Sequence, residues 1–555
     1  MESLLHYLVP LPVVLPLFAA GLEFALGIRA PRLHKIISVT TLTVVLAIGL
    51  VLLFGSDAHG PQVVHVGGWE APIGIALVAD RLSALMVTVS AAITLGVLVY
   101  SIGQGMADRD EVTPLAVYHP TYLILVAGVS NAFLAGDLFN VYVGFEILLT
   151  ASYVLLTLGG TQARIRAGAT YVVVSLLSSV VFLIAIGLVY AATGTVNMAQ
   201  LAVRLPGVPE DLRLVLQVML LVAFAIKAAV FPLSAWLPDS YPTAPAPVTA
   251  VFAGLLTKVG VYAIIRTQTL LFDGEAVADL LMWAALATML IGILGAVAQT
   301  DIKRLLSFTL VSHIGYMVFG VALTSVQGLS GAVFYVAHHI TVQTTLFLVT
   351  GLIERRGGSA SMDDLGGLAK LSPLLAILFF VPAMNLAGIP PMSGFLGKLG
   401  LMQAGVQAGT PLAYLLVAGS VLTSLLTLYA IARVWNYAFW RAPSEGMVAE
   451  PGTVLETSEE DDDSATSAYG PEEEAIGPSS RVDTVVGRTA TLGGRTVVTT
   501  TTFPATMIGA TAGLVAMGLA FTVLAGPLIG YSQRTAEELL DRSPYVEAVF
   551  PEGVA

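Results

Sequence analysis

The sequence contains no cysteine, and only 11% of its 555 residues are charged. The missing cysteines exclude disulfide bonds, cysteine-ligated iron–sulfur clusters and thiol catalysis within this chain. The scarcity of charge excludes an ordinary soluble protein, because the water-exposed surface of such a protein needs many more polar side chains. The formal net charge is −12, much of it in the acidic segment 450–474, so no basic surface for nucleic acid is expected.

Sequence signatures of cofactor binding are missing as well. Neither G-x-G-x-x-G nor G-x-x-x-x-G-K-[ST] occurs between a strand and a helix, and there is no H-E-x-x-H or similar cluster of metal ligands. We therefore expect no bound nucleotide, no metal and no other cofactor.

The sequence is instead rich in long apolar runs, since 56% of its residues are hydrophobic. Runs of about 20 residues are long enough for a helix to cross the bilayer. They are continuously apolar and do not alternate, which excludes a membrane β-barrel. The pattern predicts an all-α polytopic membrane protein with fourteen transmembrane helices, centred on 4–27, 33–54, 80–103, 115–134, 138–158, 168–192, 214–236, 245–265, 278–299, 305–324, 329–353, 373–402, 412–438 and 504–530.

These spans divide the chain into four parts. Residues 1–440 form a membrane domain of about thirteen helices, and residues 503–530 form the last transmembrane helix. Residues 441–502 between them are acidic, rich in small residues and poor in large apolar ones, which is typical of a flexible segment. A regulatory role and a plain solvated tether are both compatible with this loop. Residues 531–555 form a tail.

The loops also predict an orientation. With the N-terminus outside, the cytoplasmic loops carry more than twice as many Lys and Arg residues as the outer loops. Both termini and the tail 531–555 are then outside, and the loop 441–502 is cytoplasmic. The chain begins Met-Glu without a positive segment or a cleavage site, so we expect the first span to be retained. We expect the chain in the cell membrane of a prokaryote.

Four ionisable residues interrupt the apolar runs: Glu146, Lys227, Lys258 and Lys398. A charged side chain at the bilayer centre costs roughly 2.5–3.5 kcal/mol on insertion scales, so such residues usually mark a path for ions or protons. The alternative for Glu146 is a static ion pair that only joins two helices. Lys258 lies too far from either end of its span for its amine to reach the interface, so we expect it to point inward.

Prolines lie beside two of the lysines. Pro232 and Pro238 follow Lys227, and Pro390 and Pro391 precede Lys398. Because proline has no N–H, each residue deprives the carbonyl four positions earlier of its helical donor, and we expect broken helices here. Kinks needed only for packing would explain the prolines but not the lysines. The two breaks are five helices apart, which predicts inverted repeats of five helices each, roughly 115–265 and 278–438.

Three histidines are further candidates. His338 and His339 lie within the eleventh span, and imidazole titrates near neutrality without perturbation, which suits a proton relay. The alternative is a neutral histidine bonded to a neighbouring helix. Adjacent residues point about 100° apart, so we expect at most one of them to face a polar axis. His313 is an auxiliary candidate.

Asp301 and Lys303, with Arg304, begin the tenth span. They form either a proton entrance or, in the plainer interpretation, an anchor of the helix at the interface.

Several segments carry a family resemblance. The runs LFNVYVGFEILLTASY, AFAIKAAVFPLSAWLPDSYPTAPAPVTAVFAGLLTKVGVYAIIR, DIKRLLSFTLVSHIGYM and NLAGIPPMSGFLGK resemble the antiporter-like subunits shared by respiratory complex I, membrane-bound hydrogenases and Mrp-type antiporters. The likeness covers roughly residues 80–440. The run HHITVQTTLFLVTGLIERR is most similar to the D subunits of Mrp-type Na⁺/H⁺ antiporters.

This resemblance implies a fourteen-helix fold with two inverted repeats and a hetero-oligomeric complex with other membrane subunits. It implies that Glu146 and Lys227 form the glutamate–lysine pair of the family, that Lys258 is a central relay and that Lys398 is the lysine of the second half. Gln343 stands where the family commonly has a lysine after the histidine. Glutamine forms hydrogen bonds but holds no charge, so the relay there would use water or the histidines.

Three functions fit these residues. The first is a subunit that moves H⁺ along a buried Glu/Lys/His axis in exchange for Na⁺ carried by the complex. The second is a proton-pumping subunit of a complex I-like dehydrogenase or a membrane-bound hydrogenase. The third is a membrane scaffold in which buried charges only fix the helix register, and this explains the two broken helices least well.

Overall fold

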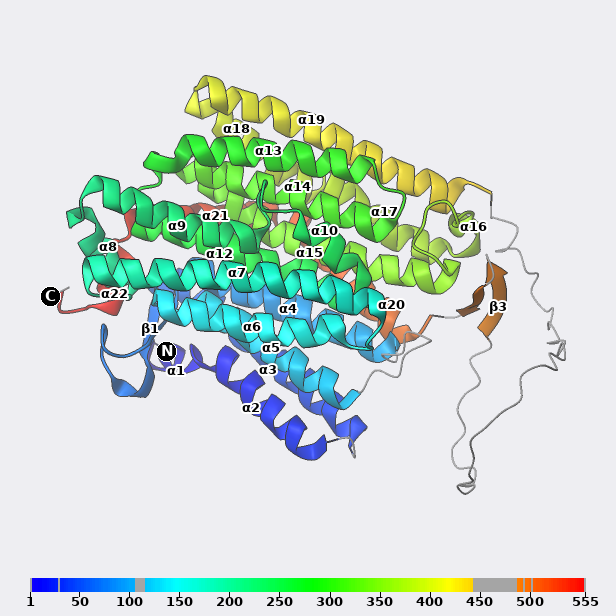
Figure 1. Cartoon of the computed structure of the whole chain (residues 1–555), viewed down its shortest axis with the longest axis horizontal. Coiled ribbons are helices and arrows are strands. Elements are labelled where there is room, and N and C mark those ends of the chain that lie inside the picture. Colours follow the sequence, from blue (N-terminus) through cyan, green and yellow to red (C-terminus); the bar gives the residue numbers. More distant parts are fainter. Residues whose placement is uncertain are drawn as a thin grey trace.

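The structure is a computed structural model that describes residues 2–27, 30–104, 115–442, 487–492, 495–500 and 503–553. Its helices lie side by side along the longest axis of the molecule (Figure 1). Within the described residues, twelve helices are long and apolar enough to cross a membrane. The predicted class, an all-α polytopic membrane protein, is confirmed.

Helices in the first half of the chain are mostly long, with a short broken region near its end. They are α1 (Glu2–Leu8), α2 (Leu11–Leu26), α3 (Pro31–His59), α4 (Arg81–Gln104), α5 (Leu115–Leu134), α6 (Leu138–Thr157), α7 (Gln162–Thr193), α8 (Met198–Arg204), α9 (Glu210–Ala228), α10 (Trp236–Ser240), α11 (Ala246–Val251) and α12 (Thr257–Arg266). Two π-helices, η5 (Phe252–Leu256) and η6 (Thr267–Leu271), flank α12.

The second half is also helical and likewise contains an interrupted segment. Its helices are α13 (Ala278–Val297), α14 (Ile302–Ala322), α15 (Val326–Gly357), α16 (Leu368–Leu371), α17 (Pro373–Ala387), α18 (Ser393–Ala408), α19 (Pro411–Val434), the π-helix η8 (Trp435–Trp440), α20 (Ala505–Val523), α21 (Ala525–Asp541) and α22 (Ser543–Val549).

Two small antiparallel hairpins complete the fold. Strands β1 (Gln62–His65) and β2 (Ala76–Ala79) pair between α3 and α4. Strands β3 (Gly487–Leu492) and β4 (Arg495–Thr500) pair inside the segment that we predicted to be a flexible loop. The sequence TVVTT of β4 is rich in β-branched residues, which favour strands. The acidic part of that loop lies outside the described residues.

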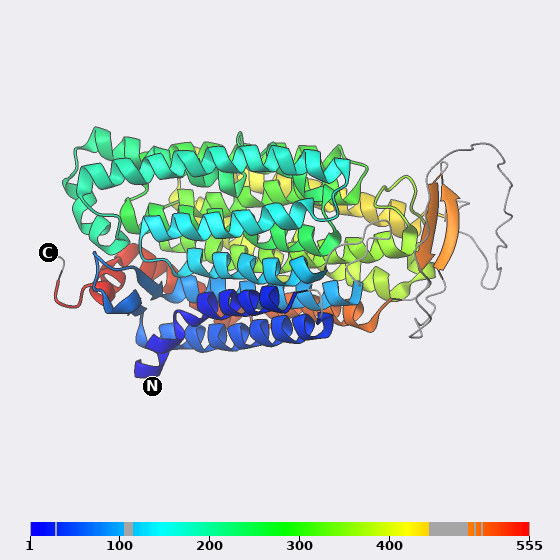
Figure 2. The same ribbon diagram turned by 60° about the horizontal axis from the view of Figure 1, so that its bottom comes forward.

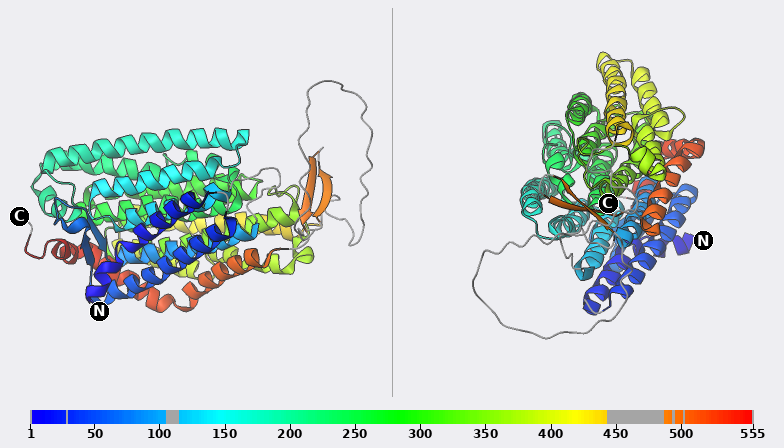
Figure 3. Two further views of the ribbon diagram at one scale, coloured as in Figure 1. Left: turned by 90° about the horizontal axis from the view of Figure 1, so that it is seen from below. Right: turned by 90° about the vertical axis from the view of Figure 1, so that its right-hand side faces the viewer.

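Helix α15 lies at the centre of the core. The 18-residue stretch of α15 that is apolar enough to cross a membrane is entirely buried, and so is the corresponding stretch of the segment Ala246–Leu271. Seen from the end of the molecule, α19 and the N-terminal helices α2 and α3 lie at opposite edges (Figure 3). In α3, α7, α19 and α20, by contrast, only 33% to 39% of the corresponding apolar stretch is buried. Their exposed apolar faces are where lipid or neighbouring subunits would contact the chain.

The two expected spans that are absent from the twelve are 214–236 and 373–402. The first ends as α9 at Ala228, and the second is divided into α17 and α18. Both interruptions begin with a left-handed residue, Ala229 (φ 58°) and Gly388 (φ 82°). The prediction of fourteen membrane crossings depends on counting these two interrupted segments.

Helix boundaries in the two halves correspond closely. Helices α6 and α14 begin at Leu138 and Ile302, 164 positions apart, and α7 and α15 begin at Gln162 and Val326, also 164 positions apart. Helices α7 and α15 each contain 32 residues. This agreement supports the repeat, which stays a prediction in its inverted form.

The C-terminal region contains more helix than the single span and the tail that we expected. Helix α20 ends at Val523, and α21 and α22 continue to Val549. Helix α21 packs against α15, and Glu538 on α21 forms an ion pair with Arg81 at the start of α4. The chain therefore closes back onto the membrane domain at the end where both termini lie (Figure 2).

A buried ion pair lies at the same end. Arg266 is the last residue of α12, and its guanidinium lies 2.6 Å from the Asp80 carboxylate. Burial acts to raise the pKa of Asp80, but Arg266 and the hydrogen bonds from Ser83 outweigh it and hold the pKa below its ordinary value. The Arg266 side chain is only 4% exposed, so it stabilises the fold through this ion pair and does not add to the charge of a loop.

Candidate functional site

Glu146 and Lys227 are joined by a serine. Glu146 lies on α6, Ser179 on α7 and Lys227 one residue before the end of α9. The Ser179 hydroxyl donates a hydrogen bond to the Glu146 carboxylate and accepts one from Lys227 Nζ at 3.2 Å. A hydroxyl can donate and accept at once, so it can connect an acid to a base that do not touch. Glu146 remains partly exposed, whereas Lys227 is buried.

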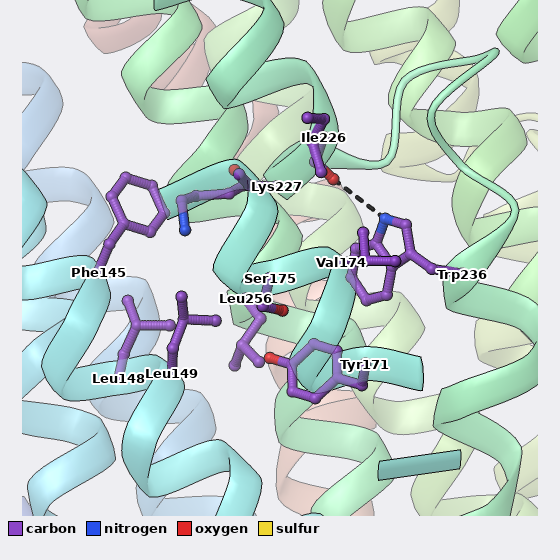
Figure 4. A pocket seen from close by; sticks show the side chains of 11 residues that line it. Phe145, Leu148, Leu149, Tyr171, Val174, Ser175, Ile226, Lys227, Trp236 and Leu256 are labelled. Carbon is purple, nitrogen blue, oxygen red and sulfur yellow. Dashed lines mark hydrogen bonds between the residues drawn. The ribbon is translucent and has the colours of Figure 1, made fainter. Parts of the chain in front are cut away.

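The amine of Lys227 points toward the ring of Phe145, 4.8 Å from its centre (Figure 4). Both residues line a small cavity together with Tyr171, Ser175 and Trp236. The space open to the centre of a water molecule is about 20 Å³, enough for roughly one water. A single water here would have the lysine and the hydroxyl groups as hydrogen-bonding partners.

The break after Lys227 is held by side chains of other elements. Trp236 Nε1 donates to the Ile226 carbonyl at 3.1 Å, and the Phe231 N–H donates to Thr288 Oγ1 on α13 at 3.0 Å. Pro232 lies within this interruption. Pro238 lies in α10, and the carbonyl of Ser234, which we expected it to free, accepts the Leu237 N–H at 3.2 Å. Proline is tolerated in the first turn of a helix, and the tighter turn supplies the missing donor.

Helix α12 approaches this break through a glycine. A side-chain carbon on Gly260 would lie 2.7 Å from the Ala228 nitrogen, so only glycine fits. Lys258, two residues earlier, is fully buried, and its Nζ donates to the Ala253 carbonyl at 2.7 Å. Ala253 belongs to η5, and π-helical turns occur frequently at functional sites.

Lys398 is positioned by the second break. Its Nζ donates to the carbonyls of Leu386 and Ala387 at 3.0 and 3.1 Å. These are the two carbonyls from which Pro390 and Pro391 remove the helical donors. The amine also lies 5.2 Å from the centre of the Tyr316 ring on α14. The site offers the lysine fixed dipoles and an aromatic face.

His338 on α15 faces this second break. Its Nδ1 lies 3.0 Å from Ser393 Oγ, and Ser393 in turn donates to Asn385 Oδ1 at 3.2 Å. The Gly394 N–H donates to the same amide oxygen at 2.8 Å. His338 is therefore connected to α17 and α18, the two arms of the broken segment.

His339 and His313 meet on the other side of α15. Their ring centres are 5.1 Å apart, and the Tyr335 hydroxyl lies 2.8 Å from His313 Nδ1. The ring of Tyr335 lies 5.4 Å from that of His338 and 6.1 Å from that of His339. Tyr335 thus connects all three histidines. Of the two adjacent histidines, His338 has a hydrogen-bonding partner, whereas both ring nitrogens of His339 are buried without one. His339 meets its neighbours through ring contacts alone.

The remaining candidates have local partners. Gln343 Nε2 donates to the Leu306 carbonyl on α14 at 2.7 Å. Asp301 caps α14 by accepting the Arg304 N–H at 2.8 Å, and Lys303 pairs with Glu354 at 2.6 Å. The contacts of Asp301 and Lys303 match those of an anchored helix start.

Sequence reasoning missed the polar residues that connect these groups. Ser179, Tyr335, Asn385 and Ser393 were not among the candidates. A serine or tyrosine in an apolar run has no charge to draw attention to it. The helical spacing between Ser175, Ser178 and Ser179, all on the buried side of α7, is the one signal that could have indicated Ser179.

Together these features define a class of protein: a multi-pass membrane protein whose buried lysines, one of them linked to a carboxylate, lie beside two interrupted helices. Comparison with known proteins narrows the class. The family model for the membrane region of NADH:quinone oxidoreductase and Mrp antiporter subunits matches residues 135–425. The chain belongs to this family.

The individual relatives are antiporter subunits. The chain is 39% identical over 439 residues to the D subunit of a Na⁺/H⁺ antiporter from Alkalihalophilus pseudofirmus, covering 79% of this chain and 87% of that protein. It is 38% identical to the protein of the same name from Bacillus subtilis, over 78% of this chain and 87% of that protein. Among solved structures, a chain of the Mrp complex from Dietzia sp. matches with a TM-score of 0.84, 33% identity and 99% coverage of both chains.

Respiratory complex I from Thermus thermophilus contains a chain of the same fold. The TM-score is 0.74 over 96% of this chain and 99% of that one, at 22% identity. A likeness at that identity establishes the architecture alone.

Proposed function

We propose that this chain is the proton-translocating subunit of a multisubunit Na⁺/H⁺ antiporter, a transporter and not an enzyme. It moves H⁺ along a buried axis of glutamate, lysine and histidine residues while the complex carries Na⁺ in the opposite direction. The relatives named as D subunits of Na⁺/H⁺ antiporters and the likeness to the Mrp complex support this assignment. The other subunits of such a complex would be its membrane partners.

One observation carries the proposal: Ser179 connects Glu146 to Lys227. A carboxylate and an amine that share one hydroxyl can exchange the position of a proton without moving the helices. Burial disfavours the charged form of each group, whereas a nearby opposite charge favours it. A change in the charge of one partner therefore alters the proton affinity of the other. This is the coupling that a transport site needs.

The second half supplies the continuation. Lys398, Tyr316, Tyr335 and His338 form successive contacts from the second break to α15. We assign Lys258 to the link between the halves, because its segment packs on α15 through Gly254 and Thr344. The redox-driven alternative shares the architecture and the family model, but the named relatives are antiporter subunits and the complex I likeness is one of fold alone.

The test is exchange by the whole complex in membrane vesicles. We expect Glu146→Ala and Lys227→Ala each to abolish Na⁺-driven H⁺ movement while the complex still assembles, because each removes one end of the bridged pair. Glu210→Ala changes an exposed glutamate at the start of α9 and is the matched control. Unchanged exchange in either of the first two variants would refute the role of the pair.

A further inference from the structure

A fully buried glutamate lies outside the sites described above. Glu23 on α2 is 0% exposed, and it was not among the sequence candidates because it lies three residues before the end of its helix. Ser38 on α3 donates to Glu23 Oε1 at 2.6 Å. His119 Nδ1 on α5 lies 3.1 Å from the same Ser38 hydroxyl. Three different helices thus meet in one hydrogen-bonded chain.

This cluster has the same design as the site on α6, α7 and α9. In both, a serine connects a carboxylate to a base, with Glu146, Ser179 and Lys227 in one and Glu23, Ser38 and His119 in the other. The N-terminal version is the more deeply buried, since Ser38 is 0% and His119 is 1% exposed.

Two buried atoms of the cluster have no hydrogen-bonding partner. They are Glu23 Oε2 and His119 Nε2. Buried polar atoms in native proteins are nearly always paired, so open positions on an acid and a base ask for an explanation. Within the described residues, no three His, Cys, Asp or Glu side chains are arranged to hold a metal ion. The acid and the base can each take up a proton without further ligands.

With Glu23 ionised, its carboxylate can only accept, and this assigns the protons of the other two groups. Ser38 has one hydrogen, and it points to Glu23, so Ser38 must accept from His119 Nδ1–H. A proton that binds His119 Nε2 forms a new N–H bond there. The Nδ1 proton then passes to Ser38 Oγ, and the Ser38 proton passes to Glu23 Oε1. The result is a neutral histidine protonated at Nε2 and a neutral Glu23 carboxyl, with one proton gained in total.

The cluster is placed for exchange with one side of the membrane. Glu23 lies about 4.5 Å from the end of α2 by the helical rise, and Ser38 and His119 lie near the starts of α3 and α5. The loop charges predict that this end of the molecule is cytoplasmic.

Few other titratable groups face it. His34 and Lys35 on α3 and Tyr118 on α5 are its neighbours, and the His34 ring centre lies 6.4 Å from that of His119. Of the helices packed on α5, α4 carries its one charged residue, Arg81, at the opposite end, and α6 carries Glu146, which faces Ser179. Helix α12 carries Lys258, bonded to the Ala253 carbonyl, and Arg266, paired with Asp80.

We propose that Glu23, Ser38 and His119 form a proton-exchange site at the predicted cytoplasmic end of the N-terminal helices, separate from the axis that runs from Glu146 to Lys398. The site exchanges H⁺ with the cytoplasmic solution and sets part of the pH response of transport. This role rests on the proposed antiport function, whereas the binding of a proton at Glu23 does not.

The first test measures the pH midpoint of exchange by the whole complex in vesicles with the cytoplasmic face outward. Glu23→Gln and His119→Gln should each move the midpoint by about one pH unit, a tenfold change in proton concentration. Because both residues belong to one relay, the double variant should move it no further than either single variant. Glu70→Gln, at an exposed loop glutamate, is the matched control and should keep the original midpoint.

Wild-type midpoints in both single variants, or shifts that add in the double variant, would overturn the proposal. Ser38→Ala keeps both titratable groups but cuts the relay, so it should give the same shift and remains informative if Glu23→Gln does not assemble. Infrared difference spectra of the purified complex between acid and alkaline solution provide a readout independent of transport. They should lose one protonated-carboxyl band in Glu23→Gln, and an unchanged spectrum would also overturn the proposal.

The outcome is distinguishable from a failure of the proposed function. If Glu146→Ala retains exchange, the main axis is wrong, whatever Glu23→Gln does. If Glu146→Ala abolishes exchange and Glu23→Gln leaves both midpoint and spectrum unchanged, only the N-terminal site is wrong.

Discussion

The region α6–α9 and the region α14–α18 share two helix starts at the same offset along the chain, but their lysines have different partners. Lys227 donates a hydrogen bond to Ser179, which in turn donates one to the Glu146 carboxylate. Lys398 is bonded to two backbone carbonyls exposed by a broken helix. At the shared offset of 164 positions, Leu310 stands opposite Glu146, and Gln343 stands opposite Ser179. The second region therefore lacks the acid and its serine.

This difference has a physical consequence. A carbonyl dipole is permanent, whereas a carboxylate loses its charge when it binds a proton. The environment of Lys227 therefore changes with the state of Glu146, while that of Lys398 is constant. We interpret the first region as the one that responds to an arriving proton and the second as the one that holds a proton in a fixed field.

The largest effect should come from the lysine in the fixed field. Lys398→Gln keeps hydrogen bonds to the carbonyls of Leu386 and Ala387 but cannot carry a proton, so exchange in vesicles should fall by about 100-fold or more. Lys370→Gln, at an exposed lysine before α17, should have no effect. Exchange close to the wild-type rate in an assembled Lys398→Gln complex would mean that the second region only supports the first.

An intermediate effect is expected from the bridging serine. Ser179→Ala removes the hydrogen bonds to both Glu146 and Lys227. One hydrogen bond to a charged group is worth about 1.5–3 kcal/mol, so exchange should fall by about tenfold to 100-fold. Ser179→Thr restores the hydroxyl and should recover most of the rate. Ser178→Ala is the neighbouring control, because the Ser178 hydroxyl donates to the Ala223 carbonyl and not to a charged group. Equal losses in Ser178→Ala and Ser179→Ala would show that packing of α7, and not the bridge, is responsible.

The smallest effect concerns the aspartates that begin α6 and α14. Asp137 and Asp301 both cap their helices, but Asp137 is only 7% exposed. Burial raises the pKa of Asp137 from 3.8 to about 6, although the backbone N–H groups of Phe139 and Asn140 act to lower it. A raised pKa means that the folded state favours the neutral carboxyl. Its contribution to stability is complete below about pH 4 and is lost as the pH rises through 6.

Asp137→Asn keeps the cap without a charge. We expect it to raise the melting temperature of the purified complex slightly at pH 8 and to leave it unchanged at pH 4. Asp301→Asn, at the partly exposed cap of α14, is the matched control for loss of a cap charge. A variant at position 137 that is less stable at pH 8 would show that the carboxylate is stabilised by its helix terminus more than it is disfavoured by burial.

Much of this architecture was predictable because it follows from strong local constraints. Long apolar runs define the membrane helices, and four charges within them define positions that need polar surroundings. Prolines beside Lys227 and Lys398 predicted interrupted helices, and the structure ends α9 and α17 at those places. A pattern in which each signal depends on a few neighbouring residues can be interpreted without a structure.

The contacts between distant segments could not be predicted in this way. Arg266 pairs with Asp80, 186 positions away, and Glu538 bonds to Arg81, 457 positions away. Nothing near either residue indicates its partner. The same holds for Ser38 and His119, whose importance follows only from the meeting of α2, α3 and α5. Uncharged bridges were missed for a related reason, because hydroxyl groups are common in membrane helices and most of them bond within their own helix.

The π-helix η5, just before Lys258, determines which way this lysine faces. Five residues per hydrogen-bonded loop, in place of four, is equivalent to inserting one residue into a regular helix. Every side chain that follows is therefore rotated by about 100° relative to an uninterrupted helix that begins at Ala246. The wider turn also brings Ala253 O within reach of the amine. The inward position of Lys258 thus originates in a deviation of the backbone one turn earlier.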